Sequence, residues 1–577
     1  MSNPSFIYRQ AKRFLIPCVA ICFVILGSIS SFNAASFTDF FGGRLPRSDS
    51  SGWIVGTVSA ARGVKQDWVV RRPLNVAFNA PIYQISVDQS GDPLLTALLV
   101  KRLMAFAGIG LLAFSLHGVL SVAANSLLFV LLAAVLFSHT LENFSSLFGK
   151  SVGYTHGTEL NGFIVVNFAL AALVAATRLV PPFILRSRVF SFVIFFPGLI
   201  LLFYAVLLRP GTLAMMPLVV AAISLNILGT IRTSGSFLRR FFPLSWLLAI
   251  AVLILSLSPG LVMQSLAYRA TTADCGVIGG NQGYTLYGMS LGSNWNLGIR
   301  DAQKLHLGHC EREVNDALLR KGKGQILADP RPLFGLLISN LRFRLSSFFL
   351  YVLQWPVWIL TFFALLRGRP RKSLRAAWLG NWQLRTIFSI SIGGWISVEL
   401  FLLLFYQEAG LRPVLAYAVF PLLAVVSLIE FCVRALRLPD RASVLLKEVT
   451  EGSVAPIQTA HQRRNSLLIL QRFVVVGPLI LLTLQLAWGC FLLVRPNPSF
   501  ASAGDQQLTG EVRVDRAQAE SGFNSAEFLK QIQENYRVRS ADPRCDSALG
   551  FVVRYTRSRL PGRYPLGDIS LECSSTT

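Results

Sequence analysis

The chain has 577 residues, of which 53% are hydrophobic and only 14% are charged. So little charge cannot cover the surface of a soluble protein of this size. The composition therefore excludes a wholly soluble protein and indicates a polytopic membrane protein. The formal net charge is +25, but the basic residues stand in short clusters between apolar runs. Membrane orientation requires that distribution, and nucleic-acid binding is therefore not expected.

Arg9, Lys12 and Arg13 precede an apolar run from about Phe14 to Ser31. A secretory signal peptide has the same plan, but this run is longer than its hydrophobic core and further spans follow. We therefore expect a retained first transmembrane helix with a cytoplasmic N-terminus.

Ten further segments are each near the ~20 residues that cross ~30 Å of hydrocarbon. They lie at about 99–121, 124–143, 159–180, 189–208, 212–231, 242–266, 345–366, 386–406, 413–435 and 471–494. The expected fold is thus all-α with about eleven spans, and basic residues concentrate in the predicted inner connections. The odd number places outside the cytoplasm the loops at about 32–98 and 267–344, and the C-terminal region 495–577.

Asp49, in the sequence SDSSGW just after the first run, is the first candidate catalytic residue. An enzyme acting on lipid-linked substrates would hold a carboxylate at such a bilayer exit. Ser48, Asp49 and Ser50 are also residue types that cap a helix, so capping is the alternative.

Four basic residues could bind lipid phosphate: Arg71 and Arg72 before Pro73, and Lys101 and Arg102 at the mouth of the second span. Such side chains also snorkel to ordinary headgroups, and the sequence leaves both readings open. The proline, aromatic and arginine residues of this loop favour juxtamembrane helices that lie in the interface.

Glu159 opens the fourth span, and His156 precedes it by about one helical turn. A second acid facing the first loop would orient an acceptor or a metal. An acidic residue at a helix start is also favourable against the helix dipole, which is the structural alternative.

The loop 267–344 contains YTLYGMSLGSNW, residues 284–295. Its glycines lack the Lys-Ser/Thr of a phosphate loop, so nucleotide binding is not indicated. Tyr284, Tyr287, Asn294 and Trp295 are suited to stacking on a sugar and hydrogen-bonding to it.

The eight cysteines include one pair in each of two predicted outer regions, Cys275 with Cys310 and Cys545 with Cys573. Two disulfides are allowed there, against the alternative of four free thiols. His306, His309 and Cys310 resemble metal ligands, but pairing with Cys275 explains Cys310 better.

Region 495–577 is expected to form a small α+β module outside the cytoplasm. Glu511 to Val514 could form a strand and Ser525 to Tyr536 a helix.

Together these motifs resemble the GT-C superfamily of bacterial integral membrane glycosyltransferases, which includes protein O-mannosyltransferases and the aminoarabinose transferase acting on lipid A. The matching features are Asp49 in SDSSGW, the Arg-Pro segment, Thr158-Glu159, and YTLYGMSLGSNW. The last is similar to a Tyr-x-Leu-Tyr-Gly-Leu-x-x-Gly-Gly-x-x-Trp pattern, from which Met289 and Ser293 depart. The likeness covers about residues 1–495 in architecture, but only these few short motifs in sequence.

The resemblance implies a multi-pass enzyme of the bacterial cytoplasmic (inner) membrane. It would move a sugar from a polyprenyl-phosphate donor, with inversion, to an extracytoplasmic acceptor glycan, lipid or protein. Asp49 would be the general base, and basic residues near the interface would hold the phosphate. No metal ligand is assigned, and the family leaves dependence on Mg²⁺ or Mn²⁺ open.

Two other classes of function compete with this reading. A flippase for lipid-linked sugars, or another transporter, would depend on charge within the membrane, where Glu399 and Glu430 are the candidates. A non-catalytic membrane scaffold with a sugar-binding C-terminal region would not need Asp49.

Overall fold

The protein is described here from a computed structural model. It describes the backbone of residues 56–63, 71–89, 93–136, 158–179, 188–209, 218–223, 242–271, 275–279, 281–304, 310–350, 381–405, 416–450, 457–495, 507–514, 538–541, 551–558 and 569–573. The first predicted span and most of those at 212–231 and 345–366 lie outside these ranges, so the number of spans stays a prediction.

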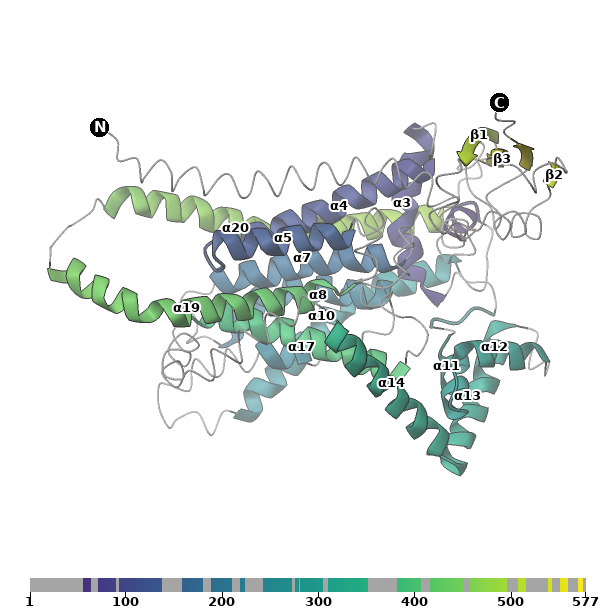
Figure 1. The fold of residues 1–577 in the computed structure, drawn as a ribbon, viewed down its shortest axis with the longest axis horizontal. Coiled ribbons are helices and arrows are strands. Elements are labelled where there is room, and N and C mark those ends of the chain that lie inside the picture. The colour runs from purple at the N-terminus through teal and green to yellow at the C-terminus, as the bar shows by residue number, and fades with distance from the viewer. Residues whose placement is uncertain are drawn as a thin grey trace.

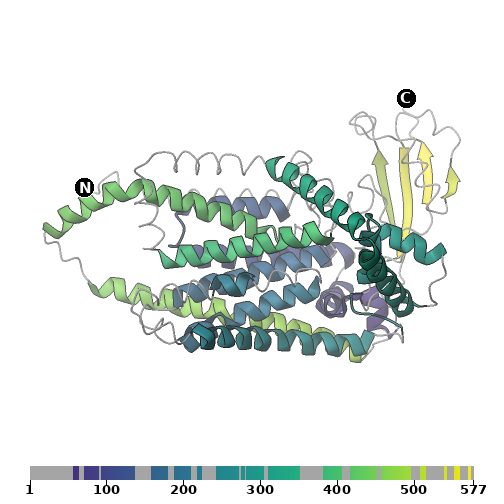
Figure 2. The same ribbon diagram turned by 90° about the horizontal axis from the view of Figure 1, so that it is seen from below.

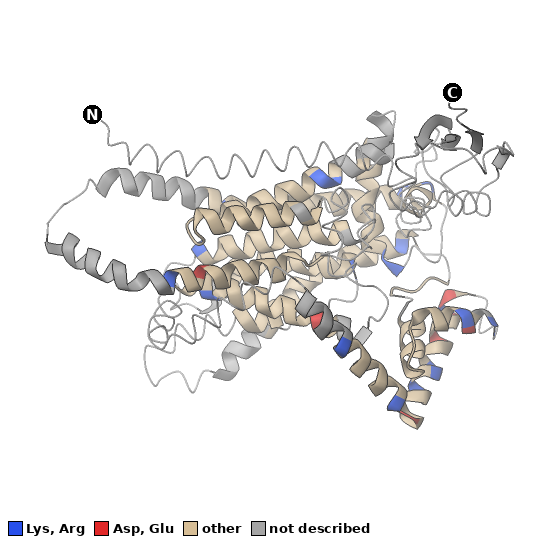
Figure 3. Cartoon of the chain, in the orientation of Figure 1, with Lys and Arg blue, Asp and Glu red and all other residues tan. Residues whose placement is uncertain are grey.

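Long helices of the described residues pack together as one bundle (Figure 1). They are α3 (Pro73–Gln89), α4 (Pro93–Leu116), α5 (Val122–Leu136), α7 (Thr158–Leu179), α8 (Arg188–Leu208), α10 (Phe242–Thr271), α17 (Trp382–Phe405), α19 (Val419–Thr450) and α20 (Ile457–Val494), counted among the described residues. Charged residues of the described bundle lie mostly toward the helix ends (Figure 3).

Four described helices contain segments long and apolar enough to cross a membrane: Leu160–Leu179, Ile250–Thr271, Trp382–Phe401 and Leu470–Val494. The first is buried along its whole length, whereas α10 and α20 expose large apolar side chains such as Ile254 (62%) and Leu481 (63%). Exposed apolar faces on this scale indicate contact with lipid. The described chain is thus a mostly helical, multi-pass membrane protein with α7 near its centre.

Two helices run well beyond their predicted apolar segments. Most of the predicted span 413–435 lies in α19, which begins at Val419 and continues to Thr450. The span 471–494 lies in α20, which already begins at Ile457. Hydropathy marks only the stretch that suits hydrocarbon, whereas backbone hydrogen bonds let a helix continue into polar sequence. The sequence therefore predicted these helices but not their lengths.

Helix α3 was expected to lie in the membrane interface. Its depth in a membrane stays a prediction, but other helices enclose it, and the residues from Leu74 to Ala80 are all buried. Its neighbours include α4, α10 and α20. Pro81 lies inside α3 and has no N–H to donate to the carbonyl of Ala77. Gly489 of α20 packs directly on that carbonyl, and a Cβ at 489 would overlap it.

The helices of residues 281–350 lie at one end of the bundle, and the last of them runs back to α17 (Figure 1). They are α11 (Asn281–Ser290), α12 (Trp295–Lys304), α13 (Glu311–Ala328) and α14 (Arg331–Leu350). Tyr287, Ala302 and Leu318 form a small core for α11, α12 and α13. Because that core is their own, the three helices form a compact unit, which we call the outer helical unit.

The C-terminal region contains a four-stranded sheet, whose strands lie side by side in Figure 2. The strands are β1 (Gln507–Val514), β2 (Val538–Ala541), β3 (Phe551–Ser558) and β4 (Ile569–Cys573), in the order β1-β3-β4-β2. Strand β3 is antiparallel to β1 and β4, and β2 is parallel to β4. The strand expected at Glu511 to Val514 is present, whereas Ser525 to Tyr536 lies outside the described residues.

Candidate functional site

The two residues expected nearest the chemistry cannot be placed fully. Asp49 and His156 lie outside the described residues. Glu159 occupies the first turn of α7, but its side chain is not described. The candidate site is therefore built from the side chains around the start of α7 and of α3.

Three buried amides join α3 to α7. Asn161 of α7 donates from Nδ2 to Oδ1 of Asn75 at 2.7 Å and to Oδ1 of Asn79 at 3.0 Å. Asn75, Asn79 and Tyr83 follow one another at intervals of four residues, which places them on one face of α3. The side chains of Asn75, Asn79, Tyr83 and Asn161 are all fully buried. We call Asn75, Asn79 and Asn161 the amide cluster.

Each amide of the amide cluster uses one polar atom within the cluster and leaves the other without a hydrogen bond in the described structure. These atoms are Asn75 Nδ2, Asn79 Nδ2 and Asn161 Oδ1. The buried Tyr83 hydroxyl also lacks a hydrogen bond in the described structure. Buried polar atoms are normally paired, so such a group points to a bound water, a ligand or another part of the chain. Sequence analysis missed these residues, although asparagines four apart in an apolar segment are a detectable signal.

Lys101 and Arg102 of α4 are enclosed by protein, with 0% and 4% of their surface exposed. The Lys101 ammonium lies 5.5 Å from the centre of the Tyr83 ring, a distance typical of cation–π contacts. Burial this complete rules out snorkelling by Lys101 to bulk headgroups, because that requires the amine to reach the surface. Lys101 therefore lies close to the polar face of α3, and Arg102 is buried beside it in the sequence of α4.

Arg71 meets the outer helical unit at the start of α3. Its Nε donates to Oε1 of Glu311, and the two side chains form an ion pair. Tyr284 is close to both: burial raises the pKa of its phenol, the Arg71 charge opposes that rise and the Glu311 charge adds to it. The structure thus brings together two expected site residues, Arg71 and Tyr284, through an acid that was not expected. Arg72 precedes α3, and its carbonyl accepts a hydrogen bond from Asn75 N at 3.0 Å.

The other residues of the 284–295 motif have structural partners. Tyr287 donates its hydroxyl to Asp301 at 3.0 Å, and Ser290 donates to Gln325 at 2.6 Å. Asn294 Oδ1 accepts from the backbone N–H of Asn296 at the start of α12, and Trp295 is 36% exposed. These contacts join α11 to α12 and α13, and sugar binding by Tyr287, Asn294 and Trp295 stays a prediction.

The predicted pair Cys275–Cys310 forms a disulfide with the Cα atoms 5.7 Å apart. Cys310 is the residue directly before α13. Cys545 lies outside the described residues and the side chain of Cys573 is not described, so their pairing is untested.

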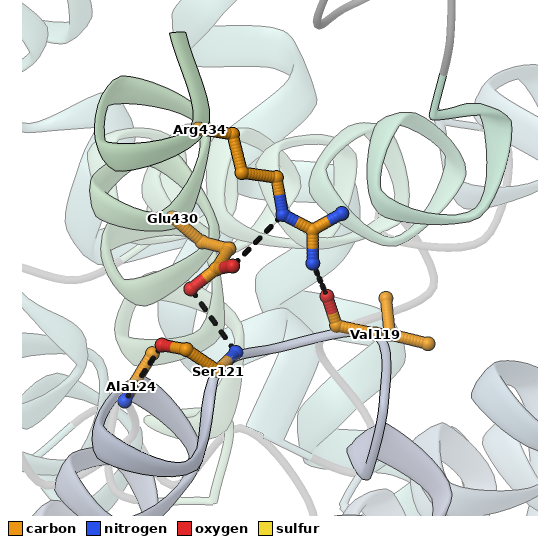
Figure 4. A network of polar contacts seen from close by, with 5 residues as sticks. All are labelled: Val119, Ser121, Ala124, Glu430 and Arg434. Atoms are coloured by element: carbon orange, nitrogen blue, oxygen red, sulfur yellow. Dashed lines mark hydrogen bonds and ion pairs between the residues drawn. The ribbon is translucent and has the colours of Figure 1, made fainter. Parts of the chain in front are cut away.

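Glu430 of α19, one of the two acids expected for a transporter, is held in a network that fastens the turn between α4 and α5 (Figure 4). Its carboxylate accepts from Arg434 Nε at 2.8 Å and from Ser121 N at 3.1 Å. Arg434 also donates to the carbonyl of Val119. These contacts use both carboxylate oxygens for structure. Glu399 lies in α17 with an intermediate exposure.

Among the described residues, no group of three or more histidine, cysteine, aspartate or glutamate side chains could hold a metal ion. His306 and His309 lie outside that part of the chain. Comparison of the chain with protein-family models, with curated proteins and with solved structures found no match.

Proposed function

We propose that the chain is a membrane glycosyltransferase of the GT-C type, with about eleven spans and a C-terminal module outside the cytoplasm. It moves a sugar from a polyprenyl-phosphate donor to an extracytoplasmic glycan, lipid or protein. One observation supports this most directly: Lys101 is buried against Tyr83 on the polar face of α3, and the amide cluster joins that face to the helix turn that carries Glu159.

The proposed reaction is a single displacement. The acceptor hydroxyl attacks the anomeric carbon, the bond from that carbon to the phosphate oxygen breaks, and the sugar is inverted. Asp49 takes the hydroxyl proton as general base, and Glu159 orients the acceptor. Buried cations offset the charge that develops on the departing phosphate, and they act strongly because water is excluded.

The test uses purified protein in lipid vesicles and a panel of labelled undecaprenyl-phosphate-linked hexoses and pentoses. We expect Asp49→Asn to lower turnover by about 10² to 10⁴-fold, the range of general base catalysis. Lys101→Met should lower it by about 10² to 10³-fold, as for a lost transition-state donor. Asp316→Asn, at an exposed residue of α13, is the matched control and should keep wild-type turnover.

Equal turnover in wild type and Asp49→Asn would remove the proposed mechanism. If no donor reacts but the wild type carries labelled lipid across the vesicle membrane, the protein is a flippase instead.

A further inference from the structure

We propose that Glu311 is a positioning residue that presents the Arg71 guanidinium to the phosphate group of the lipid-linked donor. The proposal rests on the function above for the identity of the ligand. It rests on the contacts of Arg71, Glu311 and Tyr284 for everything else.

Glu311 contacts only one side of the Arg71 guanidinium. The guanidinium is a rigid planar fork, and Glu311 contacts it at Nε. Within the described part of the chain, neither terminal amino group of Arg71 hydrogen-bonds to another residue. The side chain of Arg71 is 29% exposed, whereas that of Glu311 is only 7% exposed. Glu311 therefore holds the guanidinium at Nε and leaves the two terminal amino groups for an anion. A phosphate can accept a hydrogen bond from each of them.

Glu311 is itself held in place by a disulfide and by backbone hydrogen bonds. It follows Cys310 directly and begins α13, so the disulfide to Cys275 anchors the preceding residue. The backbone N–H of Arg312 donates to the carbonyl of Cys275 at 3.1 Å. In the same short segment, the N–H of Gly279 donates to the carbonyl of Arg71 at 3.0 Å. The segment 275–279 and the start of α13 thus hold both the backbone and the side chain of Arg71.

Tyr284 is a neighbour of this ion pair. Burial raises the pKa of Tyr284, so its hydroxyl keeps its proton at neutral pH and can donate a hydrogen bond. Tyr284 lies within electrostatic range of both Arg71 and Glu311, and Glu311 compensates part of the arginine charge. A carboxylate behind an arginine limits the rotamer freedom that would otherwise be lost on binding.

A purely structural ion pair between Arg71, just before α3, and Glu311 of α13 would make the same contact, so the test must separate the two roles. The probe is undecaprenyl phosphate without a sugar, and its binding to the full-length protein in detergent is measured by calorimetry. The variants are Glu311→Gln, Arg71→Ala and the double variant. Glu313→Gln is the matched control, because Glu313 also lies in the first turn of α13 but is exposed.

We expect Glu311→Gln to weaken binding about tenfold, the effect of losing one charge-assisted hydrogen bond. Arg71→Ala should weaken it at least as much, and the double variant no more than Arg71→Ala alone, because Glu311 acts only through Arg71. Arg71→Lys should not restore binding, since an ammonium has no fork. Glu313→Gln should bind as the wild type does.

Wild-type binding by Glu311→Gln would overturn the proposal, as would an equal further loss from Glu311→Gln in the Arg71→Ala background. Thermal unfolding of each variant detects a loss that comes from misfolding. Another outcome is that the wild type binds the lipid phosphate, with non-additive effects of Glu311→Gln and Arg71→Ala on binding, and yet transfers no sugar. In that case the proposed function fails and the role of Glu311 stands. If sugar is transferred and the cycle is additive, only the role of Glu311 fails, and absence of any lipid phosphate binding overturns both.

Discussion

At the scale of single residues, an acidic side chain inside a membrane protein has two readings, and its contacts decide between them. Glu430 was a candidate for a transport pathway because it lies in an apolar segment. Its hydrogen bonds to Arg434 and Ser121 instead assign it to the turn between α4 and α5. Arg178 supports the same turn from α7, donating to the carbonyl of Ser115 at 3.3 Å.

Glu430→Gln is therefore expected to lower stability rather than to stop activity selectively. The change leaves Arg434, which is only partly buried, without its charge partner, at a cost of about 1–3 kcal/mol. Thermal unfolding in detergent should show a lower midpoint, and turnover per folded molecule should stay close to the wild-type value. A full loss of activity in well-folded Glu430→Gln protein would return this residue to the list of functional candidates.

Most residue types at the candidate site could be identified from the sequence, but their partners could not. Charge and position near an apolar run marked Arg71, Lys101 and Arg102. Nothing local marked Glu311, because it meets Arg71 across 240 positions of the chain. Spacing alone also could not separate Tyr284, whose pKa responds to the Arg71 charge, from Tyr287, which is buried in the core of the outer helical unit.

At the scale of elements, the contact between α3 and α20 depends on one glycine. Pro81 frees the carbonyl of Ala77, and Gly489 lets the two backbones come together there. One turn away, Gln485 Nε2 donates to the carbonyl of Phe78 at 2.9 Å. Since α3 carries two members of the amide cluster, the position of the cluster depends on this packing.

Gly489→Ala should lower stability by about 1–3 kcal/mol, because the added methyl group overlaps the Ala77 backbone and the helices must move apart. Gly110→Ala in α4 is the matched control, since a Cβ there meets no atom within 4 Å. That control should be neutral or slightly stabilising, as alanine favours a helix over glycine. Equal unfolding midpoints for both variants would contradict the close approach of α3 and α20.

At the scale of the whole molecule, hydrophobic runs and basic clusters were enough to predict a helical membrane protein. They were not enough to predict that α3, α4 and α7 form a buried polar layer, because burial depends on which helices become neighbours. The disulfide Cys275–Cys310 and the strand β1 were accessible from the sequence, since pairing within one loop and alternating side chains are local signals.

The predicted orientation can be tested on the complete chain. An odd number of spans with a cytoplasmic N-terminus places the sheet of β1 to β4 outside the cytoplasm. An alkaline phosphatase fused after Thr577 should therefore be active in a bacterial host, whereas a fusion in the basic connection near Arg371 should be inactive. The reverse pattern would invert the topology, and the outer helical unit would then face the cytosol.

The lengths of α19 and α20 have a practical consequence for imaging. At 1.5 Å per residue, their 32 and 38 residues extend about 48 and 57 Å, well beyond ~30 Å of hydrocarbon. Both helices project past the same end of the bundle (Figure 1). A rigid fiducial domain grafted between Thr450 and Ile457 would add mass for particle alignment in electron cryo-microscopy, far from the surface where substrates are proposed to bind.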